Sequence, residues 1–322
     1  MTKEKQLNVV AFTIEGRLPN NDHMFSCLGK LVNLELRRLT RSEAKKFYRY
    51  ITPRQCAKYD RVLVDIPFKY MFNNVKKIRK IQNIIFLNED LCQNYIEGSK
   101  WFGRFSKFYA SLPQCRILAS GYTHTQTLKA EGIDACFVGK AFDETLILNQ
   151  ELERDIEYAF VGRINSNAYS ERKAMLSEVS KHINLETPRA NPGAEYNALL
   201  NRIVFFVSAD VGLGEYMIKN FEALAAGCLL CAFRQGEEDT VIGFKDMENA
   251  LLYSNSAELI EKINTVSSDL NLKKSIRRAG TVLAASYNYH SMSVKLFDAI
   301  SRCFVQVKPS GVFGKIKGFL DV

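Results

Sequence analysis

The segment from residue 212 to residue 227 holds the residue types whose spacing most clearly predicts chemistry. A glycine turn, Gly212-Leu-Gly214, leads into Glu215-Tyr-Met-Ile-Lys-Asn-Phe-Glu-Ala-Leu-Ala-Ala-Gly227, which predicts a helix over residues 215–226 between two strands. The start of such a helix offers free backbone N–H groups and a positive dipole end to an anion. The sequence therefore predicts an anion-binding loop and helix here.

Three side chains of this helix recur at i, i+3 and i+6, so the pattern places Tyr216, Lys219 and Glu222 on one face. A cation on that face would meet a diphosphate, and a carboxylate would accept hydrogen bonds from ribose hydroxyls. The face could therefore hold a nucleotide. An amphipathic helix whose charges only meet water is the alternative.

Acidic and imidazole side chains also follow predicted strands in the first half of the chain. Glu15 follows the first strand, with Asp22-His23 just beyond it, Glu89-Asp90 follows a later strand, and His124 follows another. Such a group at the end of a strand could remove the proton of an acceptor hydroxyl. The candidate catalytic residues are Glu15, Asp90 and His124, and a capping or solvated role is the alternative for each.

No metal site is predicted. The sequence contains no Asp-x-Asp, and the four histidines have no ligand spacing among them. The eight cysteines are scattered, and Cys228 and Cys231 lie in an apolar run that favours core packing over zinc or redox chemistry. We expect reduced thiols.

Short apolar runs alternate with amphipathic segments along the whole chain, which predicts βα units on parallel sheets. In the first half the predicted strands are residues 8–14, 31–36, 61–66, 83–87, 116–119 and 134–138. In the second half they are residues 158–161, 202–208, 228–233 and 250–253, with 183–186 as a weaker member. A polar, acidic stretch between the two series predicts two Rossmann-like domains, residues 1–150 and 151–322, the second with a C-terminal helix and a basic tail. A ligand cleft is expected between the carboxyl ends of the strands.

The composition is that of a globular protein. Of 322 residues, 47% are hydrophobic and 25% are charged, and no signal peptide or membrane-spanning stretch is visible. We therefore expect a cytoplasmic protein. Residues 1–145 carry 24 Lys and Arg against 14 Asp and Glu, so the net charge of +9 belongs to the first half. This excess favours an anionic partner such as a membrane surface, an acidic glycan or a nucleic acid, with an ordinary solvated surface as the alternative.

The motif Tyr216-x-x-Lys219-x-Phe-Glu222-Ala-Leu-Ala-Ala-Gly227 resembles the donor-site helix of CgeB-like, spore-maturation-type glycosyltransferases, which are related to family-4-like enzymes of the GT-B fold. The resemblance covers roughly residues 158–300. It includes Phe160-Val-Gly-Arg163, Glu195-Tyr-Asn-Ala-Leu-Leu-Asn201 and the late motif Tyr287-x-x-His290.

The resemblance implies that Glu222 holds the ribose and that Lys219 faces the diphosphate, with Gly162 and Arg163 approaching from the opposite loop. The predicted donor-binding residues are Gly162, Arg163, Tyr196, Gly214, Glu215, Tyr216, Lys219 and Glu222. Two positions depart from the family pattern. Gly214 stands where many retaining relatives carry a glutamate, and Ser291 stands where an arginine often follows the late histidine.

The function that the resemblance implies is transfer of a hexose from a nucleoside diphosphate to a hydroxyl of a glycan or glycolipid, without a metal or other cofactor. Synthesis of bacterial surface polysaccharide or lipopolysaccharide, at the inner membrane face, is the expected setting. A nucleotide-sugar 2-epimerase of the same architecture is the main alternative. A nucleic-acid-binding protein is a weaker one, because no nucleic-acid module is visible and isoleucine interrupts the basic run at residues 76–80.

Overall fold

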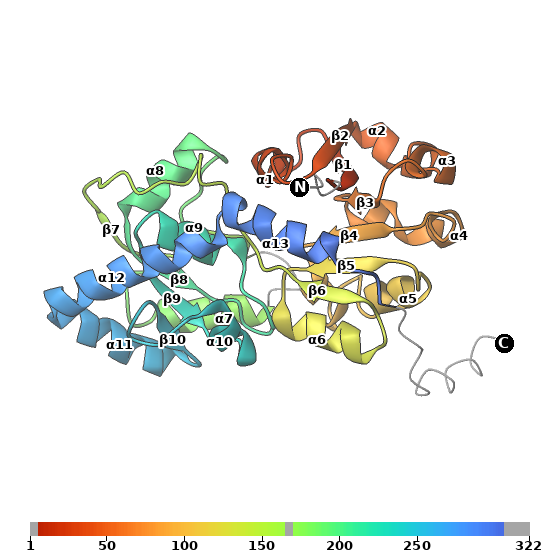
Figure 1. The fold of residues 1–322 in the computed structure, drawn as a ribbon. Helices are drawn as coiled ribbons and strands as arrows, with labels where there is room; N and C mark the ends of the chain where they lie inside the picture. The colour runs from red at the N-terminus through yellow and green to blue at the C-terminus, as the bar shows by residue number, and fades with distance from the viewer. Residues whose placement is uncertain (1–5, 165–169, 306–322) are drawn as a thin grey trace, which may run out of the picture.

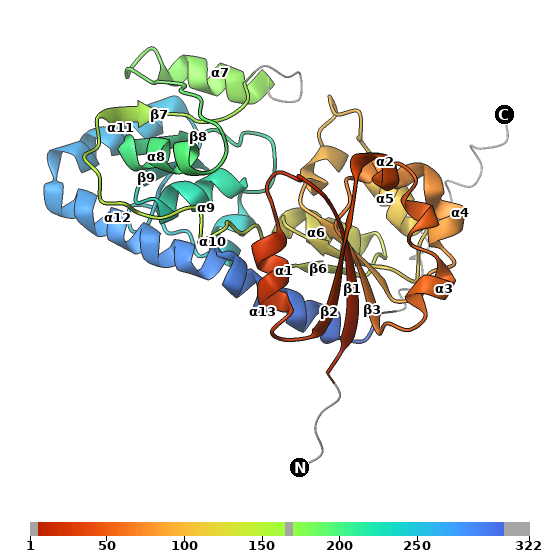
Figure 2. The ribbon, with the colours of Figure 1, turned by 90° about the horizontal axis from the view of Figure 1, so that it is seen from above.

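The computed structural model describes residues 6–164 and 170–305, which form two α/β domains side by side (Figure 1). Each domain has its own parallel sheet with helices on its faces (Figure 2). The predicted class of two Rossmann-like domains is confirmed. The predicted tail segment, residues 312–320, lies outside the described residues.

The first sheet has six parallel strands in the order β2-β1-β3-β4-β5-β6. Their bounds are β1 Asn8–Ile14, β2 Asn33–Leu39, β3 Arg61–Val64, β4 Ile84–Asn88, β5 Arg116–Ala119 and β6 Ala135–Phe137. β1, β3, β4 and β5 are almost wholly buried, as expected for strands covered on both faces. The strand order reverses between β1 and β3, so this edge of the sheet carries a topological switch point.

The second sheet has four parallel strands in the order β10-β9-β8-β7. Their bounds are β7 Ile156–Ala159, β8 Ile203–Ser208, β9 Leu229–Phe233 and β10 Leu251–Tyr253. Cys228 and Cys231 are buried and unpaired at β9, which confirms their predicted place in the core. The weak strand predicted over residues 183–186 reduces to a single isolated bridge between Glu186 and Ala159.

The helices of the first domain are short. They are α1 Asp22–Leu28, α2 Arg41–Ala44, α3 Pro53–Cys56, α4 Val75–Ile78, α5 Arg104–Ala110 and α6 Tyr122–Ala130, with 3₁₀ turns at Phe47–Arg49, Phe68–Tyr70, Phe72–Asn74 and Leu91–Asn94. Those that follow are α7 Ser170–Val179, α8 Ala194–Arg202, α9 Ile218–Ala225, α10 Glu237–Ile242, α11 Ser256–Ser268, α12 Leu270–Ala284, the 3₁₀ turn Ala285–Tyr287 and α13 Tyr289–Ser301. Within the described ranges, no helix has the length and apolar composition needed to cross a membrane.

The last helix, α13, returns to the first domain (Figures 1 and 2). Its apolar side chains, including Tyr289, Leu296 and Ile300, pack in one core with α1 and β1. Buried Arg116 holds its C-terminal end by donating to the carbonyls of Ala299, 2.7 Å away, and Arg302, 3.0 Å away. A cation is favourable at a helix C-terminus. A division of the chain at residue 150 therefore separates α13 from the first domain, although its apolar side chains pack in the core of that domain.

Candidate active site

A cavity of about 560 Å³ lies at the carboxyl edge of the first sheet, where the two domains face each other. It lies at the switch point, since Arg17 follows β1 and Asp65 follows β3. Glu89 and Asp90, which follow β4, also line it, and the second domain contributes Arg163. The cavity is therefore where an open α/β sheet is expected to bind a ligand.

Arg17 joins two carboxylates at this edge. Its guanidinium lies 2.6 Å from Glu89 and 3.0 Å from Asp65. Asp65 is buried and also accepts hydrogen bonds from Thr13 at 2.9 Å and Asn21 at 3.2 Å. Burial raises the pKa of Asp65 to about 6 against the opposing effect of Arg17. Burial also raises the pKa of Glu89, but Arg17, Lys140 and Asn21 together outweigh burial and lower this pKa. The cluster keeps Arg17 charged and fixed beside the cavity.

Asp90 is the predicted catalytic residue that lines the cavity. Its side chain is exposed to solvent. Desolvation by the neighbouring protein raises the pKa of Asp90, and Lys140 opposes the effect. A carboxylate with a raised pKa in a cleft is suited to accept a proton.

Aromatic side chains also line the cavity. Phe68 stacks on Phe105 with ring centroids 3.9 Å apart, and Trp101 meets Phe68 edge-on at 5.1 Å. Lys69 and Lys100 are exposed among the lining residues. The cavity thus combines flat apolar surfaces with fixed charges, an arrangement that suits a polar ligand with an apolar face.

In the second domain, the predicted donor residues of α8 and α9 meet one another. The hydroxyl of Tyr196 donates to Glu222 at 2.8 Å, and the Lys219 ammonium lies 5.3 Å from the centre of the Tyr196 ring. Burial raises the pKa of Glu222, whereas the Tyr196 hydrogen bond and Lys219 lower it. The three side chains form one partly buried polar group on the second domain.

Positive charge gathers around Lys219. Burial lowers its pKa, Glu222 opposes this, and the charges of Arg172 and Arg189 lower the pKa further. Arg172 itself is held 2.9 Å from Asp210, which also accepts from Asn220 of α9 at 2.8 Å. A bound anion stabilises the charged form of a lysine that neighbouring cations destabilise. This part of the domain is therefore suited to bind a phosphate group.

The loop after β7 brings Gly162 and Arg163 toward the cavity. A side-chain carbon at Gly162 would lie 2.6 Å from the ring of Phe160, so this tight turn requires glycine. Arg163 is exposed at the cavity, and its carbonyl accepts from Arg172 at 3.3 Å. The resemblance placed both residues near the diphosphate, and the structure positions Arg163 at the cavity.

The glycine turn before α9 differs from its prediction. Helix α9 begins at Ile218, so Glu215 and Tyr216 belong to the preceding loop and not to the helix face. Both side chains are buried. The hydroxyl of Tyr216 donates to Asp239 at 2.6 Å, which anchors the ring inside the second domain. The positive φ angles of Gly212 and Gly214, +72° and +64°, keep this loop out of the helix.

Glu215 reaches into the first domain. One carboxylate oxygen lies 3.3 Å from the Lys140 ammonium, and the other accepts from the Ser120 hydroxyl at 3.0 Å. Glu238 of α10 makes a second link between the domains by accepting from the Tyr122 N–H at 2.9 Å. Burial, together with the charge of Glu215, raises the pKa of Glu238 to about 8. Glu215 was predicted to bind the donor, but its carboxylate instead contacts Lys140 and Ser120 across the domain interface.

The other two predicted catalytic residues lie elsewhere. His124 is buried between the domains, where its Nε2 lies 2.7 Å from the Leu213 carbonyl and its ring stacks on Tyr95. A side chain at Gly214 would meet that imidazole at 2.9 Å. Glu15 is exposed on the loop after β1. The geometry gives His124 a packing role and separates Glu15 from the cavity lining.

Sequence reasoning missed several residues of the site. Arg17, Asp65 and Lys140 were not predicted as site residues, although Arg17 lies in the same loop as Glu15. A shared signal was present: Arg17 and Asp65 follow the two strands that flank the switch point. The strand order that brings them together is a property of the tertiary structure.

Residues 129–298 match the family model described as glycosyl transferase-like, which is more than half of the chain. No curated protein matches the chain at the sequence level. Solved structures share its fold. A sucrose-phosphate synthase from Thermosynechococcus elongatus aligns at 11% identity over 90% of this chain and 98% of its own, with a TM-score of 0.63.

Two further structures support the same architecture. Anabaena Alr3699/HepE in complex with UDP aligns at 11% identity over 92% of this chain and 100% of its own, with a TM-score of 0.60. The T4 phage enzyme BGT, in complex with UDP and Mn²⁺, aligns at 12% identity over 91% of this chain and 100% of its own, with a TM-score of 0.54. At these identities the likeness establishes the fold, which is GT-B.

Proposed function

The chain belongs to the glycosyl transferase-like family, and we propose that this glycosyltransferase moves a hexose from a nucleoside diphosphate to a hydroxyl of a glycan or glycolipid. The observation that carries the proposal is the polar group of Tyr196, Lys219 and Glu222 on the second domain. It offers a carboxylate for ribose hydroxyls beside a cation for phosphate, on the helix for which the family resemblance implies these roles.

The diphosphate end of the donor would meet cations from three elements. Lys219 lies on α9, Arg172 lies on α7, and Arg163 lies on the loop after β7. We propose that these side chains neutralise the departing diphosphate, so that transfer needs no metal ion at the donor. Transfer should then proceed at an unchanged rate whether or not Mg²⁺ or Mn²⁺ is added.

The acceptor would occupy the cavity of the first domain. Trp101 and the neighbouring phenylalanines provide flat surfaces for the apolar face of a sugar ring, while Arg17 and Glu89 provide hydrogen-bonding groups of opposite charge. We propose Asp90 as the base that takes the proton of the acceptor hydroxyl. Its place in the cavity lining and its raised pKa support this role over those of Glu15 and His124, which do not line the cavity.

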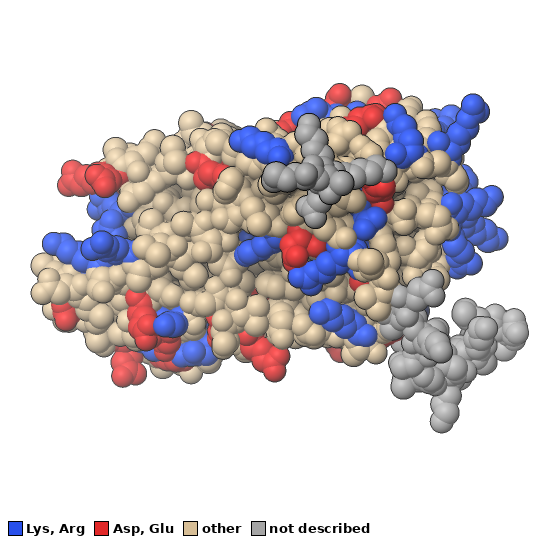
Figure 3. Space-filling model, viewed as in Figure 1, with Lys and Arg blue, Asp and Glu red and all other residues tan. Residues whose placement is uncertain are grey.

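The basic first domain suggests where the acceptor is presented. Basic side chains gather on the first domain near α3 and α4 (Figure 3). Lys76 and Lys77 on α4 and Arg79 and Lys80 directly after it are exposed. We propose that this surface holds the enzyme at an anionic membrane face, where surface polysaccharide or lipopolysaccharide is assembled.

A screen of UDP-, GDP- and dTDP-sugars for thermal stabilisation of the protein, followed by assay of diphosphate release, tests the proposal. Glu222→Ala should lower donor affinity by roughly ten- to a hundredfold, since a hydrogen bond to a charged group contributes about 1.5 to 3 kcal/mol. Glu261→Ala, on the exposed face of α11, is the matched control. Wild-type donor affinity in Glu222→Ala would refute the assignment, and conversion of the donor sugar without an acceptor would indicate an epimerase.

A further inference from the structure

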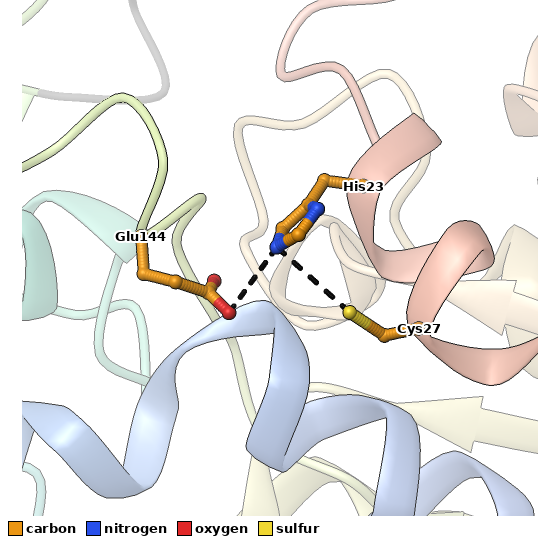
Figure 4. Close-up of side chains that lie close together, drawn as sticks. All are labelled: His23, Cys27 and Glu144. Atoms are coloured by element: carbon orange, nitrogen blue, oxygen red, sulfur yellow. Dashed lines mark hydrogen bonds and ion pairs between the residues drawn. The ribbon is translucent and has the colours of Figure 1, made fainter. Parts of the chain in front are cut away.

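Three side chains that belong to neither the donor group nor the cavity lining converge at the junction of the two domains (Figure 4). His23 and Cys27 lie one turn apart on α1, and Glu144 lies on the segment that crosses between the domains. The imidazole Nε2 of His23 lies 3.3 Å from a Glu144 carboxylate oxygen and 3.8 Å from the Cys27 sulfur. One ligand atom from each residue lies within 4.8 Å of the others.

We propose that His23, Cys27 and Glu144 form a binding site for a zinc-class divalent cation at the junction of the two domains. The ligand set is the nitrogen, sulfur and oxygen combination that zinc accepts. The fourth position of the tetrahedron would hold water.

The spacing fits a tetrahedral ion. With bonds of about 2.3 Å to sulfur and about 2.0 to 2.1 Å to nitrogen and oxygen, tetrahedral ligands lie roughly 3.4 to 3.6 Å apart. The two pairs in contact lie at 3.3 and 3.8 Å. The third pair, the Cys27 sulfur and the Glu144 oxygen, lies within 4.8 Å. These two atoms would have to approach by at most about 1.2 Å to complete the tetrahedral site.

Hydrogen bonding alone leaves this arrangement incompletely explained. A single ring nitrogen of His23 faces both the carboxylate and the thiol. If that nitrogen is protonated, its N–H donates to the carboxylate and the nitrogen has no lone pair to accept a hydrogen bond from the thiol. If the nitrogen is unprotonated, its lone pair faces the negatively charged carboxylate. A cation between the three atoms would accept one lone pair from each of them, and the thiol proton would leave to solvent on binding.

The surroundings suit a metal ligand set. The Glu144 carboxylate accepts backbone hydrogen bonds from Tyr289 at 2.9 Å and His290 at 3.1 Å, at the start of α13. Such outer contacts orient ligating carboxylates. The side chains of His23 and Glu144 remain 30% and 26% exposed, so an ion can reach the site from solvent. Cys27 is buried beneath them.

The location suggests what the ion would do. α1 belongs to the first domain, Glu144 lies on the chain between the domains, and α13 returns from the second domain to pack against α1. A bound ion would tie these three segments together. We therefore expect it to stabilise the folded protein at this junction, apart from any role at the donor.

Cobalt provides the test, because a cobalt–thiolate bond has a charge-transfer absorption that nitrogen and oxygen ligands lack. Untagged, chelator-treated full-length protein is titrated with Co²⁺ and then with Zn²⁺. We expect a thiolate band that saturates at one equivalent and disappears as Zn²⁺ displaces Co²⁺. Cys27→Ser should abolish the band, whereas Cys303→Ser, at an exposed cysteine, should retain it.

A second variant keeps the proposal testable if Cys27→Ser folds poorly. His23→Ala, at a partly exposed position, should weaken Zn²⁺ binding at least about tenfold and remove the Zn²⁺-dependent rise in melting temperature. Absence of a thiolate band at saturating Co²⁺, or a band that survives Cys27→Ser, would overturn the proposal. Equal Zn²⁺ stabilisation of wild type and His23→Ala would overturn it as well.

Discussion

Replacing Lys140 with methionine should destabilise the protein at the junction of its two domains. The Lys140 ammonium is 7% exposed and lies 3.3 Å from a carboxylate oxygen of Glu215, which is fully buried. It also donates to the Glu89 carbonyl at 2.8 Å. Methionine fills a similar volume without the charge, so the variant leaves Glu215 buried beside Glu238 with its counter-ion removed.

The size of the effect follows from the geometry. Two unit charges 3.3 Å apart attract by about 5 kcal/mol at an effective dielectric constant of about 20. Breaking a buried pair by removing one partner costs about 3 to 5 kcal/mol, because the remaining charge stays desolvated. For a chain of 322 residues we expect the melting temperature to fall by roughly 4 to 7 °C.

Thermal unfolding followed by circular dichroism measures the change. Lys181→Met removes a lysine of an exposed ion pair on the second domain and should stay within about 0.5 kcal/mol of wild type. The double variant Lys140→Met with Glu215→Gln should recover much of the lost stability, since no uncompensated charge remains. Wild-type stability in Lys140→Met, or a double variant less stable than the single one, would refute the interface role of Glu215.

Four more outcomes are expected. Lys219→Ala should weaken UDP binding by about tenfold but uridine binding little, because the diphosphate is its proposed partner; equal losses would place the lysine elsewhere. Asp90→Asn should lower kcat by about a hundredfold or more with donor affinity unchanged, and Glu97→Gln, an exposed neighbour, should not. Glu238 has its pKa raised from 4.5 to about 8, so the folded form binds an extra proton between these values and stability should fall as pH rises through them; a titration of melting temperature against pH should show this slope flattened in Glu238→Gln. Vesicles with anionic lipid should retain the protein at low salt and release it at high salt, whereas equal retention by neutral vesicles would exclude the electrostatic membrane contact.

Strand positions could be predicted because they depend on local composition. The apolar runs over residues 8–14 and 116–119 became β1 and β5 with the predicted bounds. Buried parallel strands are recognisable as short, almost wholly apolar segments between polar turns, whatever their partners in the sheet. The two-domain organisation follows from the two series of such runs.

The sequence predicted the start of α9 three residues too early, because a tertiary contact decides where this helix begins. Residues 215–217 are compatible with a helix by sequence, but Glu215 turns into the first domain to meet Lys140. Glycines at positive φ before it allow the loop to make that turn. Helical periodicity therefore assigned Tyr216 to the face of Lys219 and Glu222, although its ring is anchored in the second domain.

The sequence by itself determined the fold class, the two sheets and the proximity of Lys219 and Glu222, because i, i+3 neighbours share a helix face in any tertiary setting. Only the tertiary structure decided which residues meet across long separations. The strand order brought Arg17 to Asp65, domain contact buried Glu215, and the return of α13 set Glu144 beside His23 and Cys27. These long-range contacts depend on how the sheets and domains pack, and local sequence periodicity contains no information about that packing.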